Sequence, residues 1–506
     1  MSGAFSDVQR IVLRGTRWRA ARHLMLDFGK ASPLNFLQAL LEEEGGLPTA
    51  ANVENPELQF SLGFTRSGLK QAHVPDHVLT CFALKSPAFW AGAKPRAASH
   101  LGLTGANAPE LWDRKFAHTK LHAVLSVHAM KKNCPDMNRF IEKLQTLARK
   151  DCIACAELPA AAALDASPGV SSLEEESPKG QWVHFGYRDG LSRIGIEGWT
   201  KETAWKDCLP ISRHKAGEFV LGHVPDCGAD PWVAGPGLRV WPDKVRSFFR
   251  NGSFGVLQQI EQAVVAFEGY VKNVATRTGL DIREIKGKLC GRYPDGLPLA
   301  VPEDRHNPAA DFDYKHDSEG FKCPFGSHVR RMNPRAPILD SKQRLPTEDE
   351  LAQFPAHFSR PRPLLRRGMP YGLAWKEGEP DDGSRGLIGQ FFCASIENQF
   401  EHLLGQWADR VPLGSADSGG ARDPLIGAHE SGDGPFEIPR EKRPQDTREG
   451  PDPLRLRGLV PFTRTVGAAY LFYPSLKTLN GIADSRLWNQ DYKDGKNDTV
   501  DEDYRT

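Results

Sequence analysis

Apolar and polar positions follow two different periods along the first third of the chain. In residues 120–129 every second position is apolar, the period of a strand with one buried face. In residues 137–150 apolar side chains recur every three or four positions, which is typical of an amphipathic helix. The same patterns predict further elements: strands over 7–16, 22–29 and 57–65, and a helix over 32–44 with Ser32 as its N-cap. Strands of this alternating kind, with helices between them, indicate an antiparallel sheet with helices on one face.

A stretch rich in Ala, Pro, Ser and Glu begins near residue 156 and is typical of a linker. After it the periodic pattern resumes. It predicts these elements: strands over 182–187, 217–224, 252–260, 385–395 and 466–475, and helices over 264–275, 395–410 and 475–484. We therefore expect an α+β chain of two sheet-plus-helix units. The expected division is an N-terminal domain at 1–160, a linker at 161–180 and a C-terminal domain at 181–506, with a long loop excursion at about 411–455.

The composition is that of an ordinary globular protein, with 40% hydrophobic and 25% charged residues among 506. The 65 Lys and Arg nearly balance the 64 Asp and Glu, which argues against a dedicated nucleic-acid-binding protein. No apolar window is long enough for a membrane span and the N-terminus has no secretory signal, so we expect no membrane partner and a cytoplasmic location. Nine scattered cysteines fit free thiols in a reducing compartment. Whether the Cys152-x-x-Cys155 pair has a redox role is left open.

The stretch CPFGSHVRRMNPR, residues 323–335, places His328 among three arginines. Four interpretations compete: a metal ligand, a catalytic base, a nucleic-acid patch and a structural histidine. Zinc is disfavoured because Cys323 and His328 have no second pair at ligand spacing. Nucleic acid is disfavoured because no aromatic residues are interleaved with the arginines. A single histidine beside arginines does suit haem, whose iron takes one axial imidazole and whose propionates take guanidinium partners.

Two further stretches carry candidate chemistry. In FGYRDGLSR, residues 185–193, glycines on both sides of Asp189 allow tight backbone geometry that could aim a carboxylate into a site. The alternative is an ordinary turn aspartate, because Asp-Gly is a common turn pair. In LLRRGMPYG, residues 364–372, two adjacent arginines precede a glycine, and the alternative is a solvated basic turn.

Taken together, these blocks resemble the signature blocks of the dye-decolorizing peroxidases. The resemblance rests on G-x-x-D-G, CPFGSHVRRMNPR and RRGMPYG, and on two further blocks, RGLIGQFFCASIENQFEHLLGQW and AAYLFYPSL. The opening DVQRIVLRG is similar to that family's first strand. The blocks occur in the family's order along the whole chain, and the length resembles the family's larger members. The family fold is two ferredoxin-like α+β domains, each an antiparallel sheet with helices on one face, with haem b held mainly by the second.

The resemblance implies specific roles for residues of this chain. His328 matches the proximal iron ligand, and Arg335 matches an arginine that contacts a haem propionate. Asp189 and Arg366 match the distal pair above the iron, where the R-x-G spacing favours Arg366 over Arg367.

A proximal histidine is expected to donate its second ring N–H to a carboxylate or carbonyl. Glu397, in SIENQF, is the expected partner, and the alternative is a glutamate that is stabilised by the dipole at a helix N-terminus.

The resemblance implies a haem peroxidase that reduces hydrogen peroxide and oxidises dyes and phenolic or other aromatic donors by one-electron steps. An alternative is a protein that carries haem or releases its iron without peroxidase turnover. The presence of both Asp189 and Arg366 favours the peroxidase, because a carrier needs no distal acid–base pair. Members of this family often self-associate, so a homo-oligomer is consistent with the resemblance.

Overall fold

The computed structural model of the 506-residue chain describes most but not all of it. The described residues are 3–15, 18–43, 47–51, 56–117, 120–132, 134–164, 181–192, 194–201, 204, 208, 212–226, 243–301, 312–314, 316–335, 362–378, 380, 385–409, 421–429, 434–441 and 452–484. Most of the expected linker, residues 165–180, lies outside them, so the domain division stays a prediction. Of the expected excursion at 411–455, residues 421–429, 434–441 and 452–455 are described.

The N-terminal half builds one antiparallel sheet. Its strands are β1 (Ala20–Asp27), β2 (Leu58–Phe64), β3 (Ala123–Ala129), β4 (Ala154–Glu157) and the short β5 (Ala161–Ala162). β3 lies between β2 and β1, and β1 pairs with β4 and β5 on its other edge. Side chains of directly opposed residues share one face of an antiparallel sheet. His23 and Ser126 are such a pair, so both point to the same side of the sheet.

The C-terminal half builds a second antiparallel sheet from long strands and short edge strands. These are β10 (Ser253–Gln262), β11 (Leu365–Arg366), β12 (Met369–Tyr371), β13 (Gly386–Cys393) and β16 (Thr463–Tyr473). β10 is central, with β16 on one side and β13 on the other, and β11 and β12 pair with β13. Further short strands are β6 (Gln181–Trp182), β7 (Arg188–Asp189), β8 (Gly195–Ile196), β9 (Arg213–His214), β14 (Phe436–Ile438) and β15 (Leu454–Leu456).

The two sheets join at both ends into a closed ring of strands. One junction is the pair Phe64 and Phe472 between β2 and β16, and the other is the pair Ala161 and Tyr371 between β5 and β12. Across the enclosed interior, Gln390 Nε2 donates to Ser126 Oγ at 2.9 Å, which links the two facing sheets. Polar side chains inside such a ring need partners of this kind because they are shielded from water.

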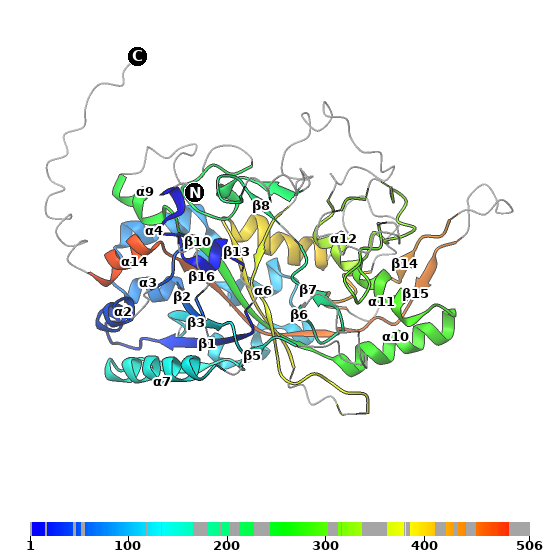
Figure 1. The fold of residues 1–506 in the computed structure, drawn as a ribbon, viewed down its shortest axis with the longest axis horizontal. Coiled ribbons are helices and arrows are strands. Elements are labelled where there is room, and N and C mark those ends of the chain that lie inside the picture. The colour runs from blue at the N-terminus through cyan, green and yellow to red at the C-terminus, as the bar shows by residue number, and fades with distance from the viewer. Residues whose placement is uncertain are drawn as a thin grey trace, which may run out of the picture.

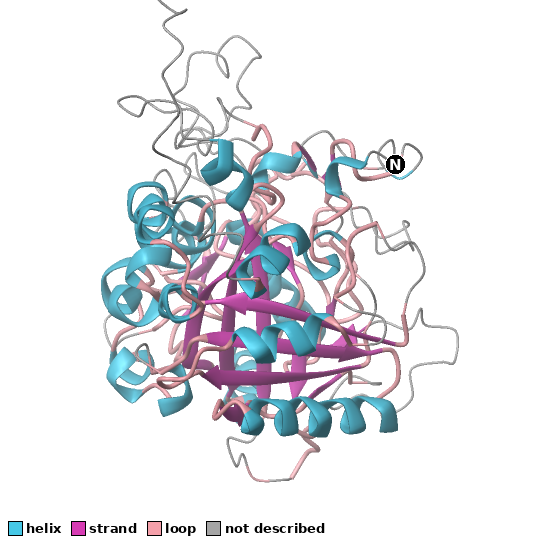
Figure 2. Cartoon of the chain, turned by 90° about the vertical axis from the view of Figure 1, so that its left-hand side faces the viewer, coloured by secondary structure: helices cyan, strands magenta, loops and turns pink. Residues whose placement is uncertain are grey.

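Helices pack around this block of strands, on its left and lower sides in Figure 2. The helices are α1 (Arg10–Leu13), α2 (Leu34–Leu41), α3 (Arg66–Gln71), α4 (Asp76–Lys85), α5 (Pro87–Ala91), α6 (Ala93–His100), α7 (Pro135–Lys150), α9 (Asp243–Phe249), α10 (Val264–Thr278), α11 (Ile282–Cys290), α12 (His328–Met332), α14 (Leu476–Ala483) and the π-helical segments η7 (Ile396–Glu401) and η8 (Leu403–Ala408). Short 3₁₀ turns complete them: η1 (Gly3–Phe5), η2 (Gly105–Asn107), η3 (Pro109–Leu111), η4 (Arg114–Phe116) and η6 (Ala216–Glu218).

Among the described residues this packing forms three hydrophobic clusters, of which two are large and the third is a small one around Leu299, Phe312 and Tyr314. The larger one surrounds the two sheets, and α7 closes it below β1 with its buried residues Ile141 and Leu144 (Figure 1). The second one lies between α10, α11 and the β14–β15 hairpin, to the right in Figure 1, and includes Phe267 and Leu289. This second core supports the segment that carries His328. The architecture is α+β and ferredoxin-like, as expected.

Several local predictions were wrong. Residues 7–16 were expected to be a strand, but Arg10–Leu13 form helix α1, because a short continuous apolar run does not distinguish helix from strand. Residues 217–224 form a 3₁₀ turn and loop in place of the expected strand. Strand β3 is buried at every position, although one exposed face was expected, because α7 packs on one face and the second sheet faces the other, where Gln390 bonds Ser126. α2 has Pro33 as N-cap in place of Ser32.

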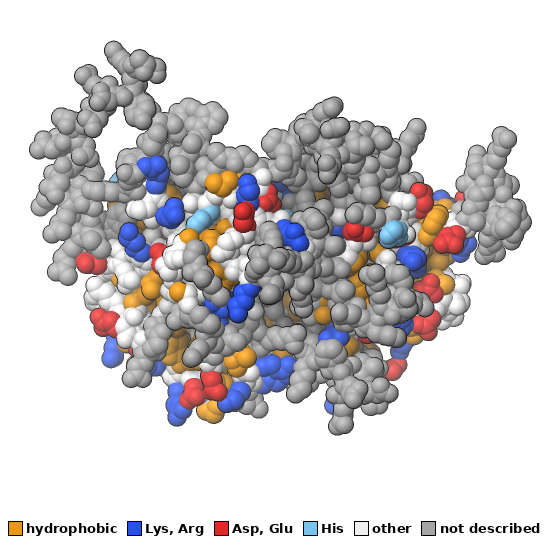
Figure 3. Space-filling view, turned by 45° about the horizontal axis from the view of Figure 1, so that its top comes forward, with side chains coloured by type: hydrophobic (Ala, Val, Ile, Leu, Met, Phe, Trp, Pro, Cys, Tyr) orange, Lys and Arg blue, Asp and Glu red, His pale blue; other side chains and the backbone are white. Residues whose placement is uncertain are grey.

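The surface gives two general observations. No helix among the described residues is long and apolar enough to cross a membrane. On the face drawn in Figure 3, described Lys and Arg side chains are interspersed with Asp and Glu, and they gather into no large patch of one sign. This mixed pattern agrees with the balanced composition.

Candidate active site

His328 begins helix α12 and is held by one buried carboxylate. Its Nδ1 lies 2.9 Å from Oδ2 of Asp423, a residue with no exposed surface. The other oxygen of Asp423, Oδ1, accepts hydrogen bonds from the backbone N–H groups of Leu425 and Ile426 at 2.9 and 3.0 Å. Both carboxylate oxygens are therefore occupied, and the imidazole is fixed in one orientation.

The charge state of this pair follows from its surroundings. Burial of Asp423 disfavours its ionised form, but His328, Arg331 and the N–H of Leu425 outweigh burial and lower the pKa of Asp423. An ionised carboxylate can only accept hydrogen bonds, so Nδ1 of His328 carries the proton and donates. In the neutral form of this imidazole Nε2 is the unprotonated nitrogen, the form in which imidazole binds metals.

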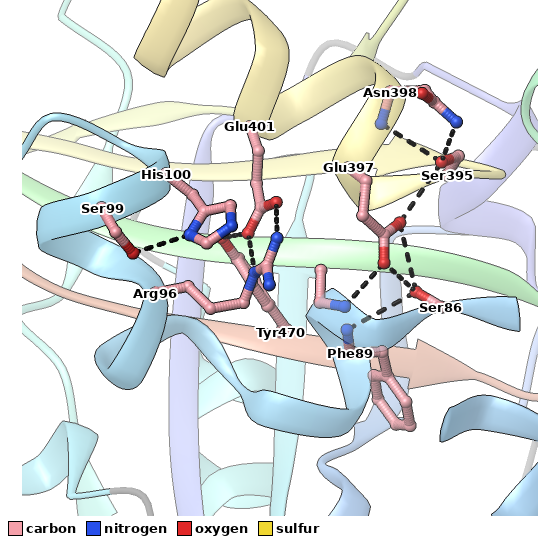
Figure 4. Close-up of polar contacts among 11 residues, drawn as sticks. Ser86, Phe89, Arg96, Ser99, His100, Ser395, Glu397, Asn398, Glu401 and Tyr470 are labelled. Atoms are coloured by element: carbon pink, nitrogen blue, oxygen red, sulfur yellow. Dashed lines mark hydrogen bonds and ion pairs between the residues drawn. The ribbon is translucent and has the colours of Figure 1, made fainter. Parts of the chain in front are cut away.

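Glu397 is not the partner of His328, so that prediction was wrong. Figure 4 shows Glu397 beside the start of α5, where Oε1 accepts from the backbone N–H of Ala88 at 2.6 Å and from Ser86 Oγ at 3.1 Å. It also accepts from Ser395 Oγ at 3.3 Å. This carboxylate ties η7 to the N-terminal helices, a structural role at a helix N-terminus.

Replacing Glu397 with alanine is expected to reduce the free energy of unfolding by about 1.5–3 kcal/mol, the usual contribution of hydrogen bonds to a charged group. The haem spectrum should not change, because Glu397 makes no contact with His328. Urea unfolding at pH 7 and an absorption spectrum measure the two quantities. Glu377→Ala is the control, since Glu377 pairs with Lys272 on the exposed surface. A changed haem spectrum in Glu397→Ala would contradict the assignment of Asp423 as the partner.

Asp189 and Arg366 come together in the wall of a cavity. A nitrogen of the Arg366 guanidinium lies 3.7 Å from Oδ1 of Asp189, and the two side chains are 48% and 43% exposed. Gly186 and Gly190, on either side of Asp189, have φ angles of +80° and +74°, which favour glycine. Two tight turns therefore direct a short carboxylate toward an arginine from strand β11.

The structure distinguishes Arg366 from its neighbour Arg367. Arg367 donates through Nε to the carbonyl of Ile11 at 2.9 Å and through Nη2 to that of Val12 at 2.8 Å. Its guanidinium is therefore committed to the backbone of α1. Arg366 is the arginine that faces Asp189, as the sequence spacing favoured.

The cavity has a volume of about 390 Å³ and is lined by both members of this pair. Its other walls include Trp18, His23 and His128 from the N-terminal half. Burial lowers the pKa of His23 to about 4, and burial with the nearby His23 and Arg367 lowers that of His128 to about 3. Both imidazoles are therefore neutral near pH 7, and Asp189 is the acidic side chain in the wall. A space of this size suits a small organic molecule.

Arg335 and Arg292 form a buried cationic region near the same site. Arg335, with φ +52°, donates to the carbonyl of Phe312 at 2.9 Å, and both guanidiniums lie over the Phe312 ring. Nη2 of Arg292 is buried and has no hydrogen-bond partner among the residues that the structure describes. Burial, together with the cations Arg335 and Arg366, lowers the pKa of Arg292 to about 10. Two cations that repel the Arg292 guanidinium, together with its unused Nη2 donor, favour a bound anion at this place.

These residues fit haem, the cofactor that the sequence resemblance implies. His328 offers an oriented imidazole nitrogen for iron, and Arg292 and Arg335 offer guanidiniums for two carboxylates.

Asp423 and Arg292 were missed by sequence reasoning. Asp423 could have been suspected because ARDPLIGAH, residues 421–429, is more apolar than the rest of the excursion. Arg292 carried no local signal. Among the described residues, no group of three or more His, Cys, Asp or Glu side chains could hold a metal ion.

Comparison with known proteins gives one consistent result. No family model matches the chain. A dye-decolorizing peroxidase of Mycetinis scorodonius is 23% identical over 513 residues, covering 94% of this chain and 87% of the relative. A multifunctional dye peroxidase of an Amycolatopsis species is 30% identical over 324 residues, covering 59% of this chain and 60% of the relative.

Solved structures agree in fold. A DyP-type peroxidase of an Anabaena species superposes with a TM-score of 0.69 at 19% identity, covering 95% of each chain. The Amycolatopsis enzyme superposes with a TM-score of 0.69 at 22% identity, covering 95% of this chain and 97% of that one. At these identities the structural comparison shows the fold alone, and the family rests on the sequence relatives.

Proposed function

The chain belongs to the dye-decolorizing peroxidase family, and we propose that it is a haem b peroxidase that reduces hydrogen peroxide and oxidises dyes and phenolic or other aromatic donors. The observation that carries the proposal is the Asp189–Arg366 pair at the wall of one cavity. A carboxylate that can move protons beside a permanent cation is what cleavage of a peroxide bond requires. A protein that only binds haem needs neither.

On this proposal, the proximal side is built from His328 and Asp423. Nε2 of His328 would hold the iron, and Asp423 would keep the proton on Nδ1, which would make the imidazole a stronger ligand. Arg292 and Arg335 would pair with the two carboxylates of the porphyrin. Bound haem supplies an iron centre that accepts peroxide and releases its oxidising equivalents one electron at a time.

On the distal side, Asp189 moves the proton. Its carboxylate takes the proton from one peroxide oxygen and returns it to the other, so that the second oxygen leaves as water. Arg366 remains charged throughout and stabilises the negative charge that develops as the O–O bond breaks. Both side chains are about half exposed, so peroxide can reach them from solvent.

The test is an absorption spectrum of the purified, haem-loaded protein before and after one equivalent of hydrogen peroxide. The proposal expects a Soret band that shifts on peroxide addition and recovers when a phenolic donor is added. A Soret band that peroxide leaves unchanged would favour a protein that carries haem or releases its iron. No Soret band after reconstitution with haem would contradict both.

A further inference from the structure

Polar side chains gather on the inner face of the N-terminal sheet. Gln59 is opposite His128, and Ser61 is opposite Ser126, in the pairing of β2 with β3. Directly opposed residues share a face, and so do residues two apart on one strand, so these four side chains form one patch. Gln390 reaches Ser126 from the facing sheet, which places the patch inside the closed ring of strands. We call these five residues the inner patch, and none is more than 3% exposed.

Much of the inner patch has no hydrogen-bond partner within the described part of the chain. The atoms concerned are both amide atoms of Gln59, the hydroxyl oxygen of Ser61, Nδ1 of His128 and Oε1 of Gln390. Buried polar atoms are rarely left without partners, and where protein atoms do not supply them an ordered small molecule usually does. Five such atoms in one patch therefore indicate a bound molecule.

The same atoms set the chemistry of that molecule. Nε2 of Gln59 can only donate, Oε1 of Gln59 and of Gln390 can only accept, and the Ser61 hydroxyl can do both. The molecule must therefore both donate and accept hydrogen bonds. The inner patch carries no charge, because burial lowers the pKa of His128 to about 3 and its imidazole is neutral near pH 7. An ion would lose its hydration there without a charged partner in the patch, so the molecule is uncharged.

The cavity gives such a molecule access to the inner patch. Ala21 is opposite His128, and His23 is opposite Ser126, so both lie on the inner face of the sheet. The cavity wall includes Ala21, His23 and His128 as well as the Asp189–Arg366 pair. One continuous space therefore joins that pair to the edge of the inner patch.

We propose that the inner patch is a binding site for small uncharged molecules that both donate and accept hydrogen bonds. Water and hydrogen peroxide share this chemistry, and the peroxide part of the inference rests on the proposed function. Hydrogen peroxide has two O–H donors and two acceptor oxygens, so it can bind the same atoms as water. A peroxide molecule held here lies in the space that leads to Asp189. No bond forms or breaks at the inner patch itself.

The first test is a crystal structure of the haem-loaded protein at a resolution that shows ordered solvent. Oxygen atoms are expected within ~3.2 Å of the Gln59 amide, the Ser61 hydroxyl and Nδ1 of His128. A second crystal separates the two sources: haem-loaded Asp189→Asn, soaked in hydrogen peroxide, which this variant should consume slowly. Two oxygens at bonding distance identify peroxide, and separate oxygens identify water. Side chains of the patch that bond directly to one another, with no oxygen between them, overturn the proposal.

Unfolding in urea gives an independent test through the sign of one change. Gln59→Met keeps the approximate shape of the side chain but removes the amide. If a molecule is bound, the substitution takes away its partner, and the urea midpoint should fall. If nothing is bound, methionine replaces two buried polar atoms that had no partner, and the midpoint should rise, which overturns the proposal. Ser61→Ala carries the same test if Gln59→Met does not fold.

Gln9→Met is the matched control. Gln9 is as buried as Gln59, but its amide is fully bonded: Nε2 donates to the carbonyls of Leu62 and Pro474 at 2.8 and 3.0 Å, and Oε1 accepts from the N–H of Leu62 at 3.0 Å. The urea midpoint of this variant should fall whether or not the inner patch holds a molecule.

These measurements separate failure of the inference from failure of the proposed function. Neither the wild-type crystal nor the unfolding midpoint depends on peroxide turnover. An inner patch without bound oxygens, in a protein whose Soret band responds to peroxide, overturns the inference alone. A Soret band that peroxide leaves unchanged contradicts the peroxidase proposal and with it the peroxide part, while ordered oxygens in the crystal still support a water site.

Discussion

Replacing His328 with alanine is expected to leave the protein without a stable Soret band after reconstitution with haem. The imidazole is the proposed axial ligand, and its removal also leaves Asp423 as a buried carboxylate without its main partner. Loss of an outer-shell partner typically costs ~10–100-fold in metal affinity, and loss of the ligand itself should cost more. Titration of the haem-free protein with haem, followed by absorption, measures the affinity.

The control for this variant is His214→Ala. His214 also pairs through Nδ1 with an aspartate, Asp226, at 2.6 Å, but it lies outside the cavity and outside the α12 segment. Its removal tests whether loss of a His–Asp pair as such disturbs the fold. Equal haem affinity in His328→Ala and wild type would show that another residue holds the iron.

Replacing Asp189 with asparagine is expected to slow the reaction with hydrogen peroxide by on the order of 10²–10⁴-fold, the contribution of a positioned acid–base group. Asparagine keeps the shape of the side chain but cannot take a proton. Arg366→Gln is expected to slow the same reaction by ~10²–10³-fold, because it removes the cation that stabilises developing charge. Stopped-flow absorption at the Soret band, under excess peroxide, measures the second-order rate constant in each variant.

The matched control is Asp295→Asn. Asp295 pairs with Arg283 at 2.7 Å, and both side chains are about half exposed, as in the Asp189–Arg366 pair. This ion pair does not line the cavity, so its loss should leave the peroxide reaction unchanged. A wild-type rate constant in Asp189→Asn would mean that another group moves the proton.

Much of the fold was predictable because secondary structure follows local spacing. The strand over 385–395 and the helices over 137–150 and 475–484 appear as β13, α7 and α14. Their periodicity depends only on neighbours in the sequence. The failures lie where spacing carries little information, as in the apolar run that forms α1, or where burial depends on a distant layer, as in β3.

The candidate active site shows the same contrast between features that local sequence predicts and features that depend on the tertiary structure. The sequence by itself was enough to select His328, Asp189 and Arg366 as candidates, because the short motifs that carry them resemble, in order, the signature blocks of a known family. Only the tertiary structure decided their partners. Asp423 reaches His328 across 95 positions, and Glu401 and Tyr470 are 69 positions apart. Such pairings arise because packing of sheets and helices brings distant side chains into one low-dielectric region, where a carboxylate needs a specific donor. Local sequence cannot name that donor, so Glu397 was a reasonable but wrong choice, and the fold supplied Asp423.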